Sequence, residues 1–420
     1  MNKIIFFLLF GVTFLGQAQQ ENTSYKKRVL ETSELEMLFS YYSQDGQNAA
    51  VSGGEGTEEL TDATSTLVLK MPLNEDDVLT VDVGISAYTS ASSSNINPFD
   101  GGGTATPFDA SSGESRNDVL AYFNPSYSHS SDDRNSIWTA KAYASNEYDY
   151  FSIGFGGSYT RLFNEKNTEI SLAFQAFLDS WNPQYPVELR GGFEGNIPGY
   201  APGFTRFENE NRNSYSTTLS ISQILSKRLQ GSLSIDIVVQ NGLLSTPFQR
   251  VYFGDVEDFF VEDFQLADDV ERLPDTRFKI PIGGRLNYYV NDFLILRSYY
   301  RFYFDDWGIT AHTASLEAPI KLNDKFTLYP TYRYYTQSDA DYFYQKEEAF
   351  SDFAFYTSDF DLSKYSANQY GFGLQYKDIF TKTKLFFFGL KTIDLKYSYY
   401  DRSNGLNASI FTLGTNFIID

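Results

Sequence analysis

Residues 146–171 read NEYDYFSIGFGGSYTRLFNEKNTEIS, and this stretch decides the fold class. Its glycine cluster resembles a phosphate-binding loop, but such a loop is followed by a helix and closed by a basic or hydroxyl residue. Here apolar side chains instead recur at every second position from Phe151 to Tyr159, with small or polar residues between them. The same alternation resumes after the turn at 164–167. The stretch therefore predicts a hairpin of two long strands with one apolar face.

The alternation recurs through almost the whole chain, for example at 79–87, 215–221, 233–239 and 326–334. It predicts about sixteen strands, with fourteen as the alternative count. The predicted strands begin near residues 33, 63, 77, 118, 136, 149, 168, 213, 229, 276, 292, 308, 325, 366, 385 and 406. Their connections are alternately tight and mostly long, which is typical of an outer-membrane barrel with short periplasmic turns and long extracellular loops. The predicted fold is an all-β transmembrane antiparallel barrel.

Soluble all-β folds explain the pattern less well. A sandwich seldom has strands this long and aromatic, and a propeller needs a blade repeat of about 40 residues that the sequence lacks. Tyr and Phe gather at predicted strand ends, as an interfacial girdle requires. The apolar phase slips near Lys391, which predicts a bulge. Asn124-Pro125 and Pro330 predict local strand irregularities.

The N-terminus, MNKIIFFLLFGVTFLGQAQQ, has the features of an export signal. One lysine precedes an apolar run, and small residues at Gly16 and Ala18 fit a cleavage site. We expect a signal peptide at 1–18, a lead-in segment at 19–32 and a single barrel domain at 33–420. Sec export would then deliver the chain to the outer membrane of a Gram-negative cell. The sequence has no cysteine, which excludes disulfides, thiol catalysis, thiolate metal sites and a lipidated mature N-terminus.

The phase of each strand predicts which ionisable residues line the pore. They are Asp82, Lys141, Glu169, Asp179, Asp236, Lys279, Arg285, Arg297, Arg301, Glu317, Arg333 and Lys396. The first half of this set is mainly acidic and the second mainly basic, which in a water-filled pore would create a transverse field. The alternative is that these groups pair with each other and fill the interior.

The loop at 255–272, DVEDFFVEDFQLADDVER, carries eight carboxylates. It could fold inward as a constriction, bind Ca²⁺ through clustered oxygens, or remain a solvated extracellular cap. Neither this loop nor SDFDLSKYS at 358–366 has the spacing of an EF-hand. We expect no other cofactor.

Histidine-based catalysis has little support in a chain with two histidines. His129 and Ser131 have the two-residue spacing that outer-membrane phospholipases use, but they lie at a predicted periplasmic turn. Ala314 occupies the corresponding position after His312. We therefore expect no enzyme, with a surface hydrolase as the weakest alternative.

Several segments resemble a known family. They are YKKRVLETSELEMLFSYYSQDGQNAAVSGGEGTEELTD, PLNEDDVLTVDVGISAYTSASSSNINPFD and SHSSDDRN, together with the opening hairpin. They are similar to an uncharacterised family of Bacteroidota proteins, a domain of unknown function of the DUF3570 type. The resemblance implies an outer-membrane barrel and supplies no activity and no site residues.

Two functions follow from the predicted fold. The first is a channel or transporter for small solutes, with outer-membrane lipid and lipopolysaccharide as neighbours. The second is a non-conducting barrel that docks surface or periplasmic proteins through its acidic loops. The formal charge of −21 gives no reason to expect a nucleic-acid partner. The bulk of the inward side chains distinguishes the two functions, because rings at positions such as Tyr143 and Phe177 would narrow the pore.

Overall fold

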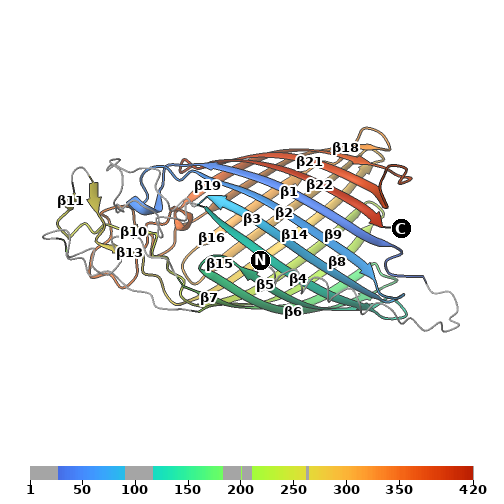
Figure 1. Cartoon of the computed structure of the whole chain (residues 1–420), viewed down its shortest axis with the longest axis horizontal. Helices are drawn as coiled ribbons and strands as arrows, with labels where there is room; N and C mark the ends of the chain where they lie inside the picture. The colour runs from blue at the N-terminus through green and yellow to red at the C-terminus, as the bar shows by residue number, and fades with distance from the viewer. Residues whose placement is uncertain (1–26, 90–116, 183–199, 201–210, 262–263, 420) are drawn as a thin grey trace.

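The chain folds into a closed antiparallel β-barrel of sixteen long strands (Figure 1). The computed structural model describes residues 27–89, 117–182, 200, 211–261 and 264–419. Each long strand pairs with the next long strand along the chain, and β1 also pairs with β22 over its full length, which closes the sheet. The predicted signal peptide at 1–18 lies outside the described residues.

The strand bounds are as follows. The long strands are β1 (Ser33–Asp45), β2 (Leu60–Pro72), β3 (Asp77–Thr89), β4 (Asn117–Ser130), β5 (Ser136–Asn146), β6 (Tyr150–Phe163), β7 (Thr168–Trp181), β8 (Arg212–Ser226), β9 (Leu229–Gly242), β14 (Thr276–Asn291), β15 (Leu294–Asp305), β16 (Thr310–Glu317), β18 (Phe326–Gln337), β19 (Tyr365–Lys377), β21 (Phe388–Arg402) and β22 (Asn407–Ile419). Two-residue strands, β17 (Ile320–Lys321) and β20 (Lys384–Leu385), join the same sheet. Sixteen strands are thus confirmed, and every predicted start lies within three residues of the observed one.

The predicted irregularities are also present. The register between β21 and β22 shifts between Leu390 and Thr392, which confirms the bulge at Lys391. Between β4 and β5 the pairing skips the residues around Pro125, which has no amide hydrogen to donate to the ladder. Pro330 lies opposite the break between β16 and β17, where its carbonyl accepts from the amide of Ala318.

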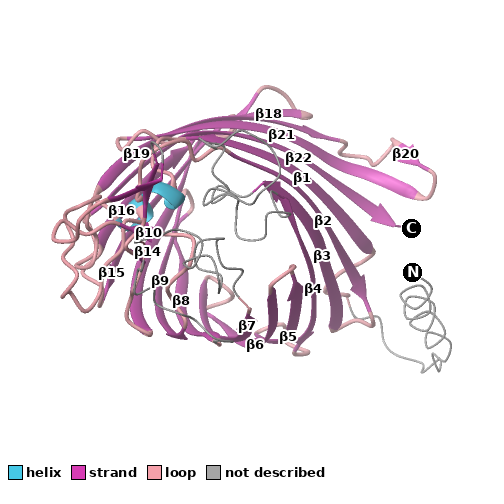
Figure 2. Cartoon of the chain, turned by 60° about the vertical axis from the view of Figure 1, so that its left-hand side comes forward, coloured by secondary structure: helices cyan, strands magenta, loops and turns pink. Residues whose placement is uncertain are grey.

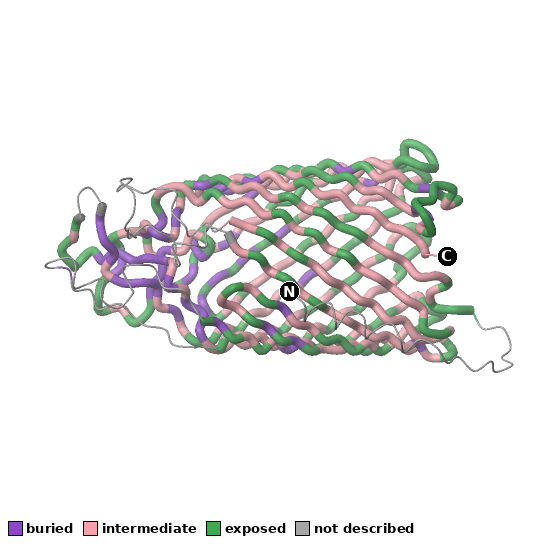
Figure 3. The backbone as a smooth tube through the Cα atoms, in the orientation of Figure 1, coloured by how far each residue is buried: buried purple, intermediate pink, exposed green. Residues whose placement is uncertain are grey.

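The two faces of the wall differ in chemistry. Large exposed hydrophobic residues occupy alternate positions of the strands, such as Phe151, Ile153 and Phe155 on β6. The positions between them carry small, polar or charged residues, and Figure 3 shows exposed and less exposed positions along the same strands. A sheet with one such face suits a lipid surround, since its strands pair with each other around a closed wall. Among the described residues, no helix is both long and apolar enough to cross a membrane.

Beyond the long-loop end of the barrel, several connections pack into a cap. The segments 46–59, 243–275 and 338–364 form it, and Figure 1 places the short strands β10 (Arg250–Val251), β11 (Phe259–Val261) and β13 (Asp269–Val270) there. The parallel bridge Phe253↔Ala349 and the antiparallel bridge Arg272↔Tyr356 tie the second and third segments together.

The cap has an apolar core of its own, formed by Val251, Phe253, Ala349 and Tyr356. The acidic loop at 255–272 adds the buried side chain of Leu266 to the cap. Residues 265–272 of this loop are therefore packed, whereas 255–258 stay exposed, so the solvated form is wrong for the second part of the loop and holds for the first. Burial of apolar surface holds the cap together.

The glycines of the deciding hairpin serve close packing. A Cβ on Gly154 would lie 2.6 Å from the ring of Phe177 and 3.2 Å from Tyr143. The two rings meet edge to face across this position, with centroids 5.4 Å apart. Gly154 is thus where bulky side chains of the neighbouring strands β5 and β7 cross over β6.

We predict that Gly154→Ala destabilises the barrel by about 1–3 kcal/mol, because the added methyl group overpacks the ring pair. Gly414→Ala is the matched control, since its Cβ would meet no atom closer than 3.6 Å. The free energy of unfolding of each variant is measured by urea titration in lipid vesicles. The folded fraction is read from the difference in gel migration between unboiled and boiled protein. Equal midpoints for the two variants would contradict the assignment.

Candidate functional site

The ionisable residues expected in the lumen lie on the strand positions that alternate with the exposed hydrophobic residues. The contacts of these residues include Asp82 with the Tyr122 hydroxyl (3.0 Å), Asp179 with the Tyr150 hydroxyl (2.5 Å), Asp236 with the Thr218 hydroxyl (2.5 Å), Arg285 over the Tyr299 ring (5.6 Å), Lys396 over the Tyr329 ring (5.9 Å) and Arg297 with Glu317 (2.7 Å). Lys141, Glu169, Lys279, Arg301 and Arg333 lie on the same alternating set of β5, β7, β14, β15 and β18. That all these residues line a pore stays a prediction.

Few of these charges neutralise each other. Within the part of the chain that the structure describes, Arg297 and Glu317 form the one ion pair in which these residues take part. The pair joins neighbouring strands β15 and β16 directly across the ladder. The other charged groups contact hydroxyls or aromatic rings, or have no described ionic partner. Mutual pairing therefore accounts for little of this set.

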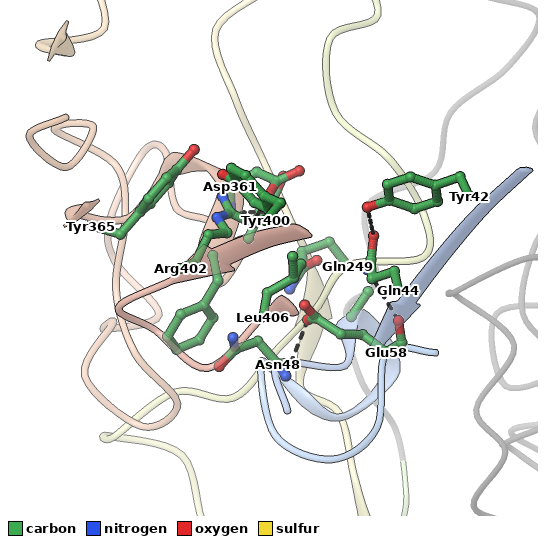
Figure 4. Close-up of a pocket in the computed structure, with 13 residues that line it drawn as sticks. Tyr42, Gln44, Asn48, Glu58, Gln249, Asp361, Tyr365, Tyr400, Arg402 and Leu406 are labelled. Carbon is green, nitrogen blue, oxygen red and sulfur yellow. Dashed lines mark hydrogen bonds and ion pairs between the residues drawn. The ribbon is translucent and has the colours of Figure 1, made fainter. Parts of the chain in front are cut away.

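A cavity of about 530 Å³ lies where the barrel wall meets the cap. Its wall comes from the ends of β1, β19 and β21 and from the cap segments (Figure 4). The lining residues are Tyr42, Gln44, Asn48, Ala50, Glu58, Gln249, Asp359, Phe360, Asp361, Tyr365, Tyr400, Arg402 and Leu406. Its volume falls in the range of about 300–1,000 Å³ that is usual for ligand pockets.

Arg402 is the central cation of the cavity wall. Its Nη1 donates to Asp361 at 2.8 Å, and its guanidinium lies 3.8 Å from the centroid of the Tyr365 ring. The residue is 7% exposed, and its Nε has no acceptor among the described residues. Ion pair and ring together fix the plane of the guanidinium at the end of β21.

A chain of hydrogen bonds orders the opposite side. The Tyr42 hydroxyl donates to Gln44 (2.7 Å), Gln44 donates to the carbonyl of Glu58 (3.1 Å), and the amide of Asn48 donates to the Glu58 carboxylate (3.1 Å), as Figure 4 shows. Gly46 makes room for this arrangement, because a Cβ there would lie 2.3 Å from the Glu58 carboxylate.

Glycine also positions the aromatic part of the wall. Gly54 has φ +91°, and the ring of Phe360 packs so closely on it that a Cβ would lie 2.2 Å from the ring. Phe360 begins a short 3₁₀ turn, Phe360–Leu362, capped by the side chain of Asp359, which accepts from the amide of Asp361. The segment 46–58 thus sets the position of Phe360.

Two carboxyl groups of the wall are driven toward their neutral form. Burial, with the nearby charge of Asp361, raises the pKa of Glu58. The same two causes raise the pKa of Asp359. The net negative charge of the cavity is therefore smaller than its three carboxylates and one guanidinium suggest.

The one metal-like grouping among the described residues lies elsewhere. Ligand oxygens of Asp118, Glu147 and Asp149 lie within 4.8 Å of one another where β4 begins, β5 ends and β6 begins. No such group forms within the described part of 255–272, so the geometry gives no support to the predicted Ca²⁺ site there.

The histidine and serine of the hydrolase alternative do not act on each other. Nδ1 of His129 hydrogen-bonds the Asp77 carboxylate at 2.6 Å. The Ser131 hydroxyl donates to Asp133 at 2.6 Å and so cannot donate its proton to His129. Both groups serve the turn and the adjacent strand end.

The residues of the cavity were not singled out from the sequence. The stretch at 358–366, which lacks the spacing of an EF-hand, supplies Asp359, Phe360, Asp361 and Tyr365. Its mixture of carboxylates and aromatic rings was the available signal. Other residues of the cavity wall lie far from this stretch and from each other in the sequence. Tyr42 and Arg402 are 360 positions apart, and no periodic pattern connects them.

Fold and site together define a closed sixteen-stranded barrel with a polar, aromatic-lined cavity at one mouth. The chain belongs to the family described as "Protein of unknown function (DUF3570)", whose model matches residues 11–414. No curated protein matches the chain.

Several solved structures are similar in outline. A "bacterial polysaccharide outer membrane secretin" is 11% identical with a TM-score of 0.46, covering 93% of this chain and 100% of that one. Pseudomonas aeruginosa OccK1 (OpdK) is 8% identical with a TM-score of 0.40, covering 92% and 98%. A mutant ferric enterobactin receptor of Pseudomonas aeruginosa is 13% identical with a TM-score of 0.44, covering 90% and 55%. Such values do not carry a ligand over to this chain.

The cap contains a buried acid that makes its stability depend on pH. Glu271 is 2% exposed and accepts from the amide of Thr246 (2.6 Å) and the hydroxyl of Thr357 (2.7 Å). Burial raises its pKa from 4.5 to about 8. The folded cap therefore keeps a proton that the opened cap has lost, and its stability falls as pH rises through this window.

We predict that the amides of Arg272 and Tyr356, which bond each other's carbonyls across the cap, lose protection from hydrogen exchange between pH 5 and pH 8.5. The expected loss is about tenfold or more after correction for intrinsic rates. Glu271→Gln mimics the protonated acid and should give a shallower dependence, the remainder coming from Asp268, whose pKa burial raises to about 6. An unchanged slope in the variant would contradict the assignment.

Proposed function

We propose that this protein is an outer-membrane channel for small polar solutes. In this proposal the exposed hydrophobic face contacts lipid and lipopolysaccharide, and the cap lies on the cell surface. The tight turns then face the periplasm, as they do in bacterial barrels. The cavity beneath the cap becomes the vestibule through which a solute reaches the lumen.

The observation that carries the proposal is that Arg301 and Arg333 keep charges opposite the lipid face that are unpaired among the described residues, although Glu36 with Lys70, Arg277 with Asp305 and Glu34 with Lys391 form ion pairs on that face. A filled, structural barrel would neutralise buried charges by mutual pairing, because an isolated charge costs several kcal/mol in a dry interior. Here Arg297 and Glu317 pair, while Arg301 and Arg333 have no described ionic partner. Charges left in this state favour contact with water and ions.

We predict stable ion conductance when the purified protein is reconstituted in planar bilayers. The double variant Arg301→Gln/Arg333→Gln should shift the reversal potential in a KCl gradient toward cation preference, because it removes two positive charges from the wall. The shift should shrink at high salt, since the Debye length falls to about 3 Å at 1 M.

Lys166→Gln is the control, because it removes a positive charge from the turn between β6 and β7 and should leave the reversal potential unchanged. Silence under several salts and voltages, from protein that still migrates as a folded barrel, would overturn the channel and favour a non-conducting docking barrel.

A further inference from the structure

We propose that the cavity beneath the cap binds a neutral saccharide. The inference rests on the proposed channel function, because it treats the cavity as the entrance of the solute path. The site is built from residues far apart in sequence, and its chemistry selects among solute classes.

The wall offers hydrogen-bond donors and acceptors side by side. The Tyr400 hydroxyl lines the cavity without a hydrogen-bond partner among the described residues. Asp361 uses one carboxylate oxygen for Arg402, and its side chain is 73% exposed. Glu58 likewise uses one oxygen for the amide of Asn48. A hydroxyl group both donates and accepts, so a polyhydroxylated ligand satisfies every kind of group on this wall.

The charge of the wall argues against ionic ligands. Burial favours the neutral forms of Glu58 and Asp359, so Asp361 and Arg402 are the main charges of the wall, and they pair with each other. An anion would meet the Asp361 carboxylate, whose side chain is 73% exposed. A cation would lie beside the Arg402 guanidinium and leave the donors of the wall without acceptors. A neutral ligand avoids both conflicts.

The aromatic residues supply the complementary apolar contact. Tyr42, Phe360, Tyr365 and Tyr400 line the cavity, and a sugar ring presents C–H groups on its faces and hydroxyls at its edge. The negative face of an aromatic ring attracts such C–H groups. Phe360 is held by its packing on Gly54, and the Arg402 guanidinium is held by Asp361 and Tyr365. Much of the wall is thus ordered before a ligand binds, which reduces the entropy lost on binding.

The test is isothermal titration of the full-length protein in lipid nanodiscs with glucose, maltose and N-acetylglucosamine as neutral probes. Choline and glutamate serve as the cationic and anionic probes. We expect saturable binding of at least one neutral sugar and none of the two ions. Binding of choline or glutamate without a sugar, or binding of no probe at all, would overturn the proposal.

Tyr400→Phe removes only the hydroxyl that lacks a described partner and should weaken sugar binding about two- to tenfold, the loss expected for one hydrogen bond. Tyr399→Phe is the matched control, because Tyr399 is the preceding residue of β21, is 39% exposed and lies on the opposite face of the wall. Equal losses in the two variants would overturn the role of the cavity.

Conductance of the same purified protein in planar bilayers separates the two proposals. Sugar binding by a protein that does not conduct would overturn the channel and support the site. Conductance without sugar binding would support the channel and overturn the site.

Discussion

The pairing of the first strand with the last is the constraint on which the rest of the structure depends. Ser33–Asp45 of β1 and Asn407–Ile419 of β22 form an unbroken antiparallel ladder. A wide open sheet would leave two edges of unpaired amides and carbonyls, and in hydrocarbon each such group costs several kcal/mol. Closure removes both edges at once. It also brings together chain ends that a linear view of the sequence keeps apart.

The candidate site is a direct product of this closure. Tyr42 belongs to β1, whereas Tyr400 and Arg402 belong to β21, so they become neighbours through β22, which pairs with both strands. Figure 2, which turns the barrel so that its cap end comes forward, shows β1, β22 and β21 side by side in the wall. The cap covers this part of the mouth. Segment 46–58 follows the end of β1, and segment 359–361 precedes the start of β19. A mouth site of this kind needs no dedicated domain.

The period of two explains why so much of the wall was predictable from sequence. A residue in a barrel wall faces either lipid or the interior. The alternation of Phe151, Ile153 and Phe155 with small or polar residues therefore indicates which face each residue is on. Strand count, strand starts and the bulge at Lys391 follow from that period and its one slip. The loops obey no such rule. The cap is held by contacts such as Phe253 with Tyr356, with ring centroids 5.0 Å apart, between segments about a hundred positions apart in the sequence. Neither its cores nor the cavity could therefore be predicted.

Packing of the cap has a consequence for how the mouth can work. The cap carries one apolar core of its own, shares a second with the β15–β16 end of the wall, and holds a buried acid, Glu271, so it is more ordered than a set of independent loops. It also contains Phe360 and the Glu58 segment, which form part of the cavity wall. Any opening of the cap therefore removes part of the site, and any ligand that bridges Glu58, Phe360 and Arg402 holds cap and barrel wall together. Binding and cap closure are thermodynamically linked by these shared residues, and each must favour the other to the same extent.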